Sequence, residues 1–456
     1  MSLETFLDPE TWAMEQWGNV ELGDSRRNER AVKVGAALAA HPGSSLPTQL
    51  GNWNDLRAAY RLFGEADVSH RELSQPHWHR TREQAQQHES PIVLWVQDST
   101  ELDYSHHTST RGLGVIGSGK TQGLMMHSCL AVIPTPGNPD LLGLGGQAVW
   151  SRPVKTESET TKTRKRSEGE KWIEMLTRIG PVPATRLQRW VSVGDRESDI
   201  FSYLRRSQEQ GWDSLVRVAQ NRVVISAEGE RTYLKTLART LPPQAQKTIV
   251  LRGRDGHPQR SIELHIAWTR VLVCPPQSGP ERHQAPQSLW CIRCWEDSPE
   301  GLEWILLTTV DPNLYSALVQ VDWYASRWLI EEYHKCLKTG CALEARQLET
   351  AAGLMRLTGF LGIIAVRLLQ LRTLSRSHAD LPVQPLIPEE VLQLLQVRLG
   401  LFALPATWGQ FWQSVARLGG FLARKSDGQP GWQSIWRGWL RLQDFWWGTN
   451  FQLHRT

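Results

Sequence analysis

The stretch from Tyr324 to Lys338, YASRWLIEEYHKCLK, has the period of an α-helix with two different faces. At about 100° per residue, Tyr324, Arg327, Glu331 and Lys338 point to one side, and apolar side chains such as that of Ile330 point to the other. The pattern predicts one helix with a core face and a face that carries a phenol, a guanidinium, a carboxylate and an ammonium. Taken alone, this polar face is better explained as a solvated surface with ion pairs one turn apart, such as Arg327 with Glu331.

Helical periodicity also covers residues 1–75. The run ELGDSRRNERAVKVGAALAAH offers a cap at Asp24 and continues as an alanine-rich helix. Its first turns carry Arg26, Arg27 and Arg30, although positive charge at a helix start opposes the helix dipole. A bound phosphate backbone would explain this cluster, and so would a solvated charged helix; the stretch leaves both open.

From about residue 76 the pattern changes to short apolar runs that predict β-strands. Strands are expected at residues 91–100, 124–133, 141–150 and 189–194, with helices at 171–180 and 198–206. The first strand delivers Asp98 near its end, and Asp195 follows the last. The charged segment 154–172 is expected to be a mobile loop. This order predicts an α/β core with two carboxylates at strand ends, where such sheets place their sites.

The second half of the chain alternates between the two periods. Residues from about 220 to 320 alternate apolar and polar positions, which predicts a β-rich insertion. Residues 352–375 predict one long helix. The tail from about residue 385 is helical and rich in tryptophan, with a break expected at Gly419 and Gly420.

Composition is compatible with a protein of several domains. The chain has 456 residues and a net charge of only +4, which permits a nucleic-acid partner without requiring one. Six scattered cysteines fit a reducing compartment. The start of the sequence shows no secretory signal, and the most apolar run, 361–371, is interrupted by Arg367 and Gln370. We therefore expect a cytoplasmic protein without a membrane span.

Three carboxylates in separate segments suggest metal chemistry. Two Mg²⁺ ions about 4 Å apart need oxygen ligands such as Asp98, Asp195 and Glu331, and one carboxylate can bridge them. Beside such a site, Arg327 and Lys338 would suit phosphate oxygens. Either aspartate alone is better explained as a cap or a loop end, but the three together favour metal-dependent phosphoryl transfer.

A competing motif lies at Gly114–Thr121, which matches the phosphate-binding pattern GxxxxGK[ST]. That chemistry needs a strand before the loop and a helix after it, so that backbone amides and the helix dipole face the phosphate. The flanking residues instead predict no buried strand before the loop and a strand after it. We interpret residues 112–121 as a flexible glycine loop and keep an ATPase that uses Lys120 as a minor alternative.

Two further patterns are interpreted as structural. Cys291 and Cys294 form a CxxC pair, but they lie inside a strand pattern, and their spacing from Cys274 and His283 fits no common zinc module. His127 lies in a predicted strand and is interpreted as a core residue with satisfied hydrogen bonds.

The order and spacing of Tyr324, Arg327, Glu331 and Lys338 reproduce the Y-(2)-R-(3)-E-(6)-K signature of bacterial insertion-sequence transposases of the DDE type. The runs GDSRRNERAV near the start, GDRESDIFSYL around Asp195 and ARLGGF near the end are also similar to that family, in unchanged order. The chain therefore resembles these transposases over nearly its whole length.

The resemblance implies an α/β fold with three parts. A helical DNA-binding domain is expected at residues 1–75, and a helical dimerisation domain at 376–456. Between them, residues 76–375 are expected to form an RNase H-like catalytic core with a β-rich insertion at about 220–320.

The resemblance also implies roles for individual residues. Asp98, Asp195 and Glu331 would be the catalytic triad that holds two Mg²⁺ or Mn²⁺ ions. The residues expected to contact DNA are Tyr324, Arg327 and Lys338 at phosphates, Trp304 against a flipped base, Trp328 beside Arg327, and Arg26, Arg27 and Arg30 in the first domain.

The implied activity is cut-and-paste DNA transposition by a homodimer. Its expected partners are double-stranded DNA, both the terminal inverted repeats of a transposon and the target. Cleavage is expected to pass through a hairpin before the 3′-ends are joined to the target. The alternative is an RNase H-like, metal-dependent nuclease without strand transfer.

Overall fold

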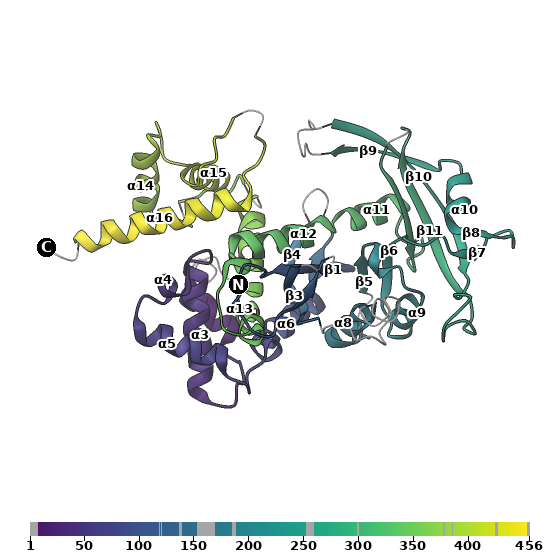
Figure 1. The fold of residues 1–456 in the computed structure, drawn as a ribbon. Helices are drawn as coiled ribbons and strands as arrows, with labels where there is room; N and C mark the ends of the chain where they lie inside the picture. Colours follow the sequence, from purple (N-terminus) through teal and green to yellow (C-terminus); the bar gives the residue numbers. More distant parts are fainter. Residues whose placement is uncertain are drawn as a thin grey trace.

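The computed structural model describes most of the chain (Figure 1). The described residues are 8–117, 119, 121–135, 139–152, 169–184, 188–251, 260–298, 301–376, 379–384, 386–424 and 427–453. Most of the segment expected to be a mobile loop, 154–172, lies outside them, as does Lys120.

The N-terminal part is helical, as the sequence predicted. Its helices are α2 (Pro9–Trp17), α3 (Ser25–Ala40), α4 (Leu46–Leu50), α5 (Trp53–Gly64) and α6 (His70–Gln87). Asp24 caps α3, because its carboxylate accepts a hydrogen bond from the backbone N–H of Arg26. The change of pattern at residue 76 is not an element boundary, since it falls inside α6, which packs on both the sheet and the long helix of the core.

A mixed sheet forms the centre of the molecule (Figure 1). Its strands are β1 (Ile92–Asp103), β2 (Gly114–Ile116), β3 (Thr121–Ile133), β4 (Asp140–Trp150), β5 (Arg189–Gly194) and β6 (Asp213–Arg217). β2 and β4 both pair antiparallel with β3, and β3 pairs antiparallel with β1. β1 then pairs parallel with β5, and β5 pairs parallel with β6.

Both faces of the central strand are buried, which explains its nearly continuous apolar sequence. Leu94 and Val96 belong to the core cluster that contains the long helix α13 (Ala351–Arg376). Val93 and Trp95 belong to the cluster on the other face, with α8 (Lys171–Ile179) and α9 (Phe201–Glu209). The period-two alternation of a strand thus divides β1 between two helical layers.

The predicted β-rich insertion continues the central sheet. It contains β7 (Val223–Ile225), β8 (Arg231–Tyr233), α10 (Leu234–Thr240), β9 (Ala245–Leu251), β10 (Arg260–Val273), β11 (Gln287–Glu296) and β12 (Glu303–Thr308). β12 pairs with β6, so one twelve-stranded sheet runs through both regions. Cys291 and Cys294 lie three residues apart in β11, where side chains of odd separation point to opposite faces, so the two thiols do not form a metal pair.

The stretch expected to be a single helix at Tyr324–Lys338 is divided into three pieces. α11 (Ala317–Ala325) ends one residue after Tyr324, α12 (Trp328–Lys335) begins after a break at Ser326 and Arg327, and a π-helical turn follows at Cys336–Gly340. A short 3₁₀ turn, Leu343–Ala345, then leads to α13. The prediction of one continuous helix was therefore wrong, because the 3.6-residue period does not register a change of axis between two consecutive helices.

α13 is long enough, and over a window of 18 residues apolar enough, to cross a membrane. Yet 83% of that window is buried inside the protein, as expected of a core helix. Arg367 within it lies 4.8 Å from the ring centroid of Trp12, and burial lowers the pKa of this guanidinium to about 9. The helix is hydrophobic on all sides because it packs against the sheet and the N-terminal helices at once.

Buried arginines fasten the N-terminal helices to the core. Arg356 donates hydrogen bonds to the carbonyl oxygens of Phe63 and Val68, and Arg367 donates to that of Ala39 at 3.2 Å. Arg346 likewise donates hydrogen bonds to carbonyl oxygens in the loop before α4. A guanidinium can satisfy several orphaned carbonyls at helix ends at once, so these contacts define one arrangement of the two regions.

The C-terminal region consists of α14 (Glu389–Leu399), α15 (Trp408–Leu418) and α16 (Trp432–Leu453), of which α16 projects away from the body (Figure 1). The expected break is confirmed, because α15 ends just before Gly419, and Gly420 has φ +95°. α15 and α16 approach so closely that a Cβ at Gly438 would lie 1.7 Å from the carbonyl oxygen of Val415.

We predict that Gly438→Ala lowers the midpoint of thermal unfolding, because α16 must move away from α15. The expected cost is about 1–3 kcal/mol, as for other overpacked sites. Gly448→Ala is the matched control, because it lies in the same helix with nothing within 4 Å of its added Cβ. That control should be neutral or stabilising by up to about 1 kcal/mol. Equal midpoints for the two variants, measured by circular dichroism, would contradict the close packing.

Candidate active site

Asp98 and Asp195 lie beside each other because of the register between β1 and β5. The parallel pairing runs from Ile92 opposite Arg189 to Val96 opposite Val193, and the same offset places Asp98 level with Asp195. Asp195 follows β5 as predicted, but Asp98 does not end its strand, since β1 continues to Asp103. The second half of β1 is polar and pairs only with β3, so the pattern of apolar residues did not predict it.

Glu331 approaches these aspartates from α12. Arg327, at the start of that helix, donates one hydrogen bond from Nη1 to Oδ2 of Asp98 at 3.0 Å and another from Nη2 to Oε1 of Glu331. The side chains of Arg327 and Asp98 are only 19% and 17% exposed, whereas that of Glu331 is 44% exposed. One guanidinium therefore bridges carboxylates that are 233 positions apart in the chain.

Burial shapes the charge state of the two aspartates. It raises the pKa of Asp98 to about 6, and the negative charge of Asp195 adds to the rise, while Arg327 opposes it. Burial also raises the pKa of Asp195, against a hydrogen bond that its carboxylate accepts from the N–H of Glu197. Two carboxylates that repel each other in a partly dry site are suited to holding a cation between them.

The loop after Asp195 is fixed by a fully buried carboxylate. Asp199 accepts hydrogen bonds from the N–H groups of Ala219 and Gln220 and from Nε of Arg222. Asp199 is 1% exposed, so its satisfied charge locks the start of the β-rich region to the turn that carries Asp195.

Tyr324 does not lie on an exposed face with Arg327 and Glu331, as the helical pattern predicted. It is buried at the end of α11, and its ring meets that of Trp304 edge to face, with 5.1 Å between centroids. Burial raises the pKa of the phenol, and the charges of Arg327 and Arg217 act against this rise. Trp304 is half-buried in β12.

Lys338 lies in the π-helical turn that follows α12. Its Nζ donates to the carbonyl oxygen of Glu101 and lies 3.3 Å from Oε1 of Glu344. The carboxylate of Glu101 in turn accepts a hydrogen bond from the N–H of Gly117. Part of the segment expected to be a flexible loop forms β2, which pairs antiparallel with β3, so the helix that a phosphate loop needs after it is replaced by a strand.

The remaining predicted DNA contacts are placed in different surroundings. Trp328 is half-buried, with the guanidinium of Arg372 over its ring at 4.8 Å. Arg26 is exposed at 89% of its side chain. Arg27 is paired with Glu65 at 2.8 Å, and Arg30 with Asp55, so these two hold α3 against the neighbouring helix.

The structure adds residues that the sequence analysis missed. Glu197 is a fourth carboxylate near the site, paired with Lys171 of α8 at 3.1 Å, and its charge raises the pKa of both aspartates. His334 is buried on α12, one turn after Glu331, and its Nε2 has no hydrogen-bond partner among the described residues. Burial lowers its pKa to about 3, so it is neutral. The spacing Glu331-x-x-His334 was the available signal.

His127 has the structural role that was predicted. It is fully buried, with hydrogen bonds to Oγ of Ser99 at 2.9 Å and Oε1 of Gln97 at 3.0 Å, and its ring packs edge-on against Trp172. Both ring nitrogens are occupied, so the imidazole supports the strand that carries Asp98.

The donor set fits a hard divalent cation, because it consists of carboxylate oxygens. In the described part of the chain, however, no group of three or more His, Cys, Asp or Glu side chains is gathered tightly enough to hold one. The guanidinium of Arg327 lies between two of the carboxylates and hydrogen-bonds both Asp98 and Glu331.

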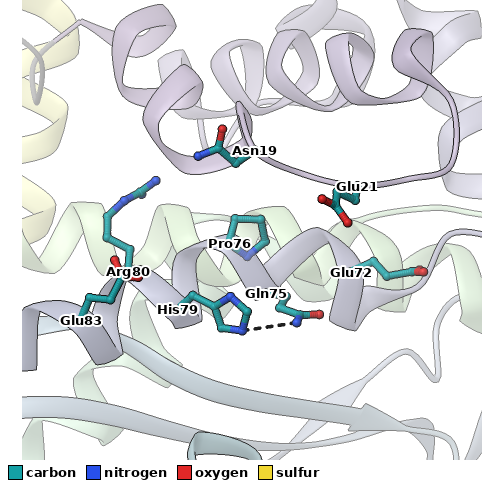
Figure 2. Close-up of a pocket in the computed structure, with 8 residues that line it drawn as sticks. All are labelled: Asn19, Glu21, Glu72, Gln75, Pro76, His79, Arg80 and Glu83. Carbon is teal, nitrogen blue, oxygen red and sulfur yellow. Dashed lines mark hydrogen bonds between the residues drawn. The ribbon is translucent and has the colours of Figure 1, made fainter. Parts of the chain in front are cut away.

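A pocket of about 550 Å³ lies elsewhere, between α6 and the connection from α2 to α3 (Figure 2). It is lined by Asn19, Glu21, Glu72, Gln75, Pro76, His79, Arg80 and Glu83. Three glutamates against one arginine make a poor phosphate site. The pocket includes none of the predicted site residues.

Two family models match the chain. A model described as "Transposase DNA-binding" matches residues 9–68, and one described as "Transposase DDE domain" matches residues 157–366. The first match covers α2 to α5. The second includes Asp195 and Glu331, whereas Asp98 lies before its start.

We predict that Asp98→Asn stabilises the chain in EDTA at about pH 7.5, because asparagine resembles the protonated acid. The carboxyl pKa is about 6 in the folded chain against an ordinary 3.8, so the folded state loses stability as the pH rises through 6. The gain should reach at most about 3 kcal/mol and shrink toward about pH 4.5. Differential scanning calorimetry across this range measures it.

Asp103→Asn is the control on the same strand. Hydrogen bonds from Ser105 lower the pKa of that carboxyl, so its replacement should give no gain at neutral pH. A gain for Asp98→Asn that did not change with pH would argue against the buried-charge explanation.

Proposed function

Because the chain belongs to the insertion-sequence DDE transposases, we propose that it is a cut-and-paste transposase whose catalytic triad is Asp98, Asp195 and Glu331. Metal-dependent cleavage of DNA follows from the DDE domain, and a DNA partner follows from the DNA-binding region. The observation that carries the assignment of the triad is that Arg327 hydrogen-bonds both Asp98 and Glu331, while the charge of Asp195 acts on Asp98.

The topology supports an RNase H-like core. The order β4-β3-β1-β5-β6 combines three antiparallel strands with two parallel ones, and the carboxylates lie where β5 ends beside β1. In this proposal residues 76–375 form the catalytic part, although α6 links it firmly to the helices before it. The insertion extends the same sheet.

The three carboxylates would hold the divalent ions, two Mg²⁺ or Mn²⁺ in our proposal. Such ions supply activation of the attacking hydroxyl and stabilisation of the leaving oxygen. The protein supplies the rest: Asp199 fixes the turn that carries Asp195, and the strand register fixes Asp98. Rigid placement of this kind is what in-line phosphoryl transfer requires.

The cations around the triad would position the DNA strand. Arg327 offers a planar fork that matches two phosphate oxygens, and Lys338 offers a point charge beside it. Tyr324 packs against Trp304 and would support the side chains that contact the phosphate. In the N-terminal region, Arg26 is the arginine best placed for DNA, because its side chain is 89% exposed beside its partner Asp24, whereas those of Arg27 and Arg30 are only 30% and 26% exposed.

The proposed reaction has four steps. Water cuts one strand at the transposon end, and the freed 3′-hydroxyl attacks the opposite strand to give a hairpin. After the hairpin is reopened, the 3′-ends attack the target DNA. The transposon ends would be paired by a homodimer through the C-terminal helices, in the cytoplasm. A nuclease with the same triad but without strand transfer is the competing function.

We predict that Asp98→Asn, Asp195→Asn and Glu331→Gln each reduce cleavage by about 10³-fold or more, as loss of a catalytic group does elsewhere. The substrate is a duplex copied from the DNA that flanks the coding region, incubated with Mg²⁺ and a target plasmid. Each variant should still shift the duplex in a gel. Cleavage by any of the three variants would remove that residue from the triad, and cuts without joined product in the wild type would favour a nuclease.

We predict that Trp304→Ala reduces the yield of hairpin while the first nick persists. Flipping a base onto the indole would relieve strain in the tight hairpin, and unstacking costs a few kcal/mol. Trp304→Phe should retain part of the yield. Trp295→Ala is the control, because Trp295 lies on the neighbouring strand one register position away and so faces the other side of the sheet. Unchanged hairpin yield in Trp304→Ala would remove the stacking role.

A further inference from the structure

We propose that Arg327 keeps the metal site closed in the DNA-free chain and that a DNA phosphate opens it by drawing the guanidinium away. This inference rests on the proposed triad and adds a coupling between DNA binding and metal binding. It concerns the order of binding: the metal ions would bind tightly only after the DNA strand has bound.

The geometry supports a blocking role. Arg327 gives one N–H group to Asp98 and one to Glu331, which are two of the three proposed ligands. A cation on these oxygens would have to displace both hydrogen bonds. The side chain of Arg327 is 81% buried, so water screens these contacts less than it would screen a surface pair.

The charges explain why the carboxylates need a positively charged group beside them when no metal ion is bound. Burial and Asp195 disfavour a free charge on Asp98, and the guanidinium offsets part of that cost in the metal-free site. The same positive charge repels an arriving divalent ion. Arg327 thus stabilises the empty arrangement and opposes metal binding by the same contacts.

A phosphate can release the guanidinium because it presents two oxygens to the same fork. Arg327 lies at the break between α11 and α12 and makes no side-chain cap of α12, so a changed side-chain position leaves the helix bonding intact. By linkage, DNA that favours the released state must tighten metal binding by the same factor as metal tightens DNA binding.

The test is binding of Mn²⁺ to the full-length chain without DNA, followed by electron paramagnetic resonance. Arg327→Gln removes the charge and the fork and should bind Mn²⁺ about tenfold more tightly than the wild type, equal to about 1.4 kcal/mol. Arg205→Gln removes a comparable arginine–glutamate pair one helical turn apart on α9, and its affinity should equal that of the wild type. Equal affinity for Arg327→Gln and the wild type would overturn the proposal.

Two further measurements separate this idea from the triad itself. Asp98→Asn should bind Mn²⁺ more weakly than the wild type. If the two proteins bind Mn²⁺ with equal affinity, the proposed triad is wrong, whatever the role of Arg327. The flanking-DNA duplex should tighten Mn²⁺ binding by the wild type but not by Arg327→Gln. Ions held by the DNA itself are measured in a titration of Asp98→Asn with the same duplex, and this titration is subtracted from the others. Equal tightening in both proteins would show that Arg327 does not couple the two ligands.

Discussion

The parallel pairing of β1 with β5 is the constraint on which the site depends. β5 ends at Gly194, whereas β1 continues, and this difference in length leaves Asp98 facing the turn that carries Asp195. The turn itself requires glycine, because a Cβ at Gly194 would lie 2.4 Å from Oγ of Ser198 and 2.9 Å from the ring of Trp172. A slip of one residue in this register would turn Asp98 to the other face of the sheet.

The site is supported by contacts that reach well beyond it. Asp199 locks the turn after Asp195 to the β-rich region, and Arg356 and Arg367 lock α13 to the N-terminal helices. Each of these charged groups is buried and satisfied mainly by backbone groups or by a partner of opposite charge, which makes the arrangement costly to change. The family matches divide the chain into a DNA-binding region and a DDE region, but the packing joins them into one body.

The sequence was sufficient for the features that periodicity and local chemistry determine. It predicted the alanine-rich helix capped by Asp24, the β-rich insertion and the core role of His127. It did not predict the break at Arg327, because two consecutive amphipathic helices produce almost the same pattern as one. It also could not show that Arg27 and Arg30 are neutralised by Glu65 and Asp55, since those carboxylates lie more than twenty residues away. Long-range pairing is set by packing, which a single sequence does not display.

Arg327 shows how stability and function oppose each other at one position. A triad with a carboxyl pKa raised by burial is unfavourable when empty, and the guanidinium reduces that cost by bridging Asp98 and Glu331. Arg327, the proposed phosphate contact, is therefore also the residue that holds Asp98 and Glu331 together in the DNA-free chain. A single side chain can serve both purposes only because carboxylate and phosphate present the same pair of oxygens to its fork. Lysine would hold one oxygen at a time, so it would neither close the empty site nor grip the strand as well.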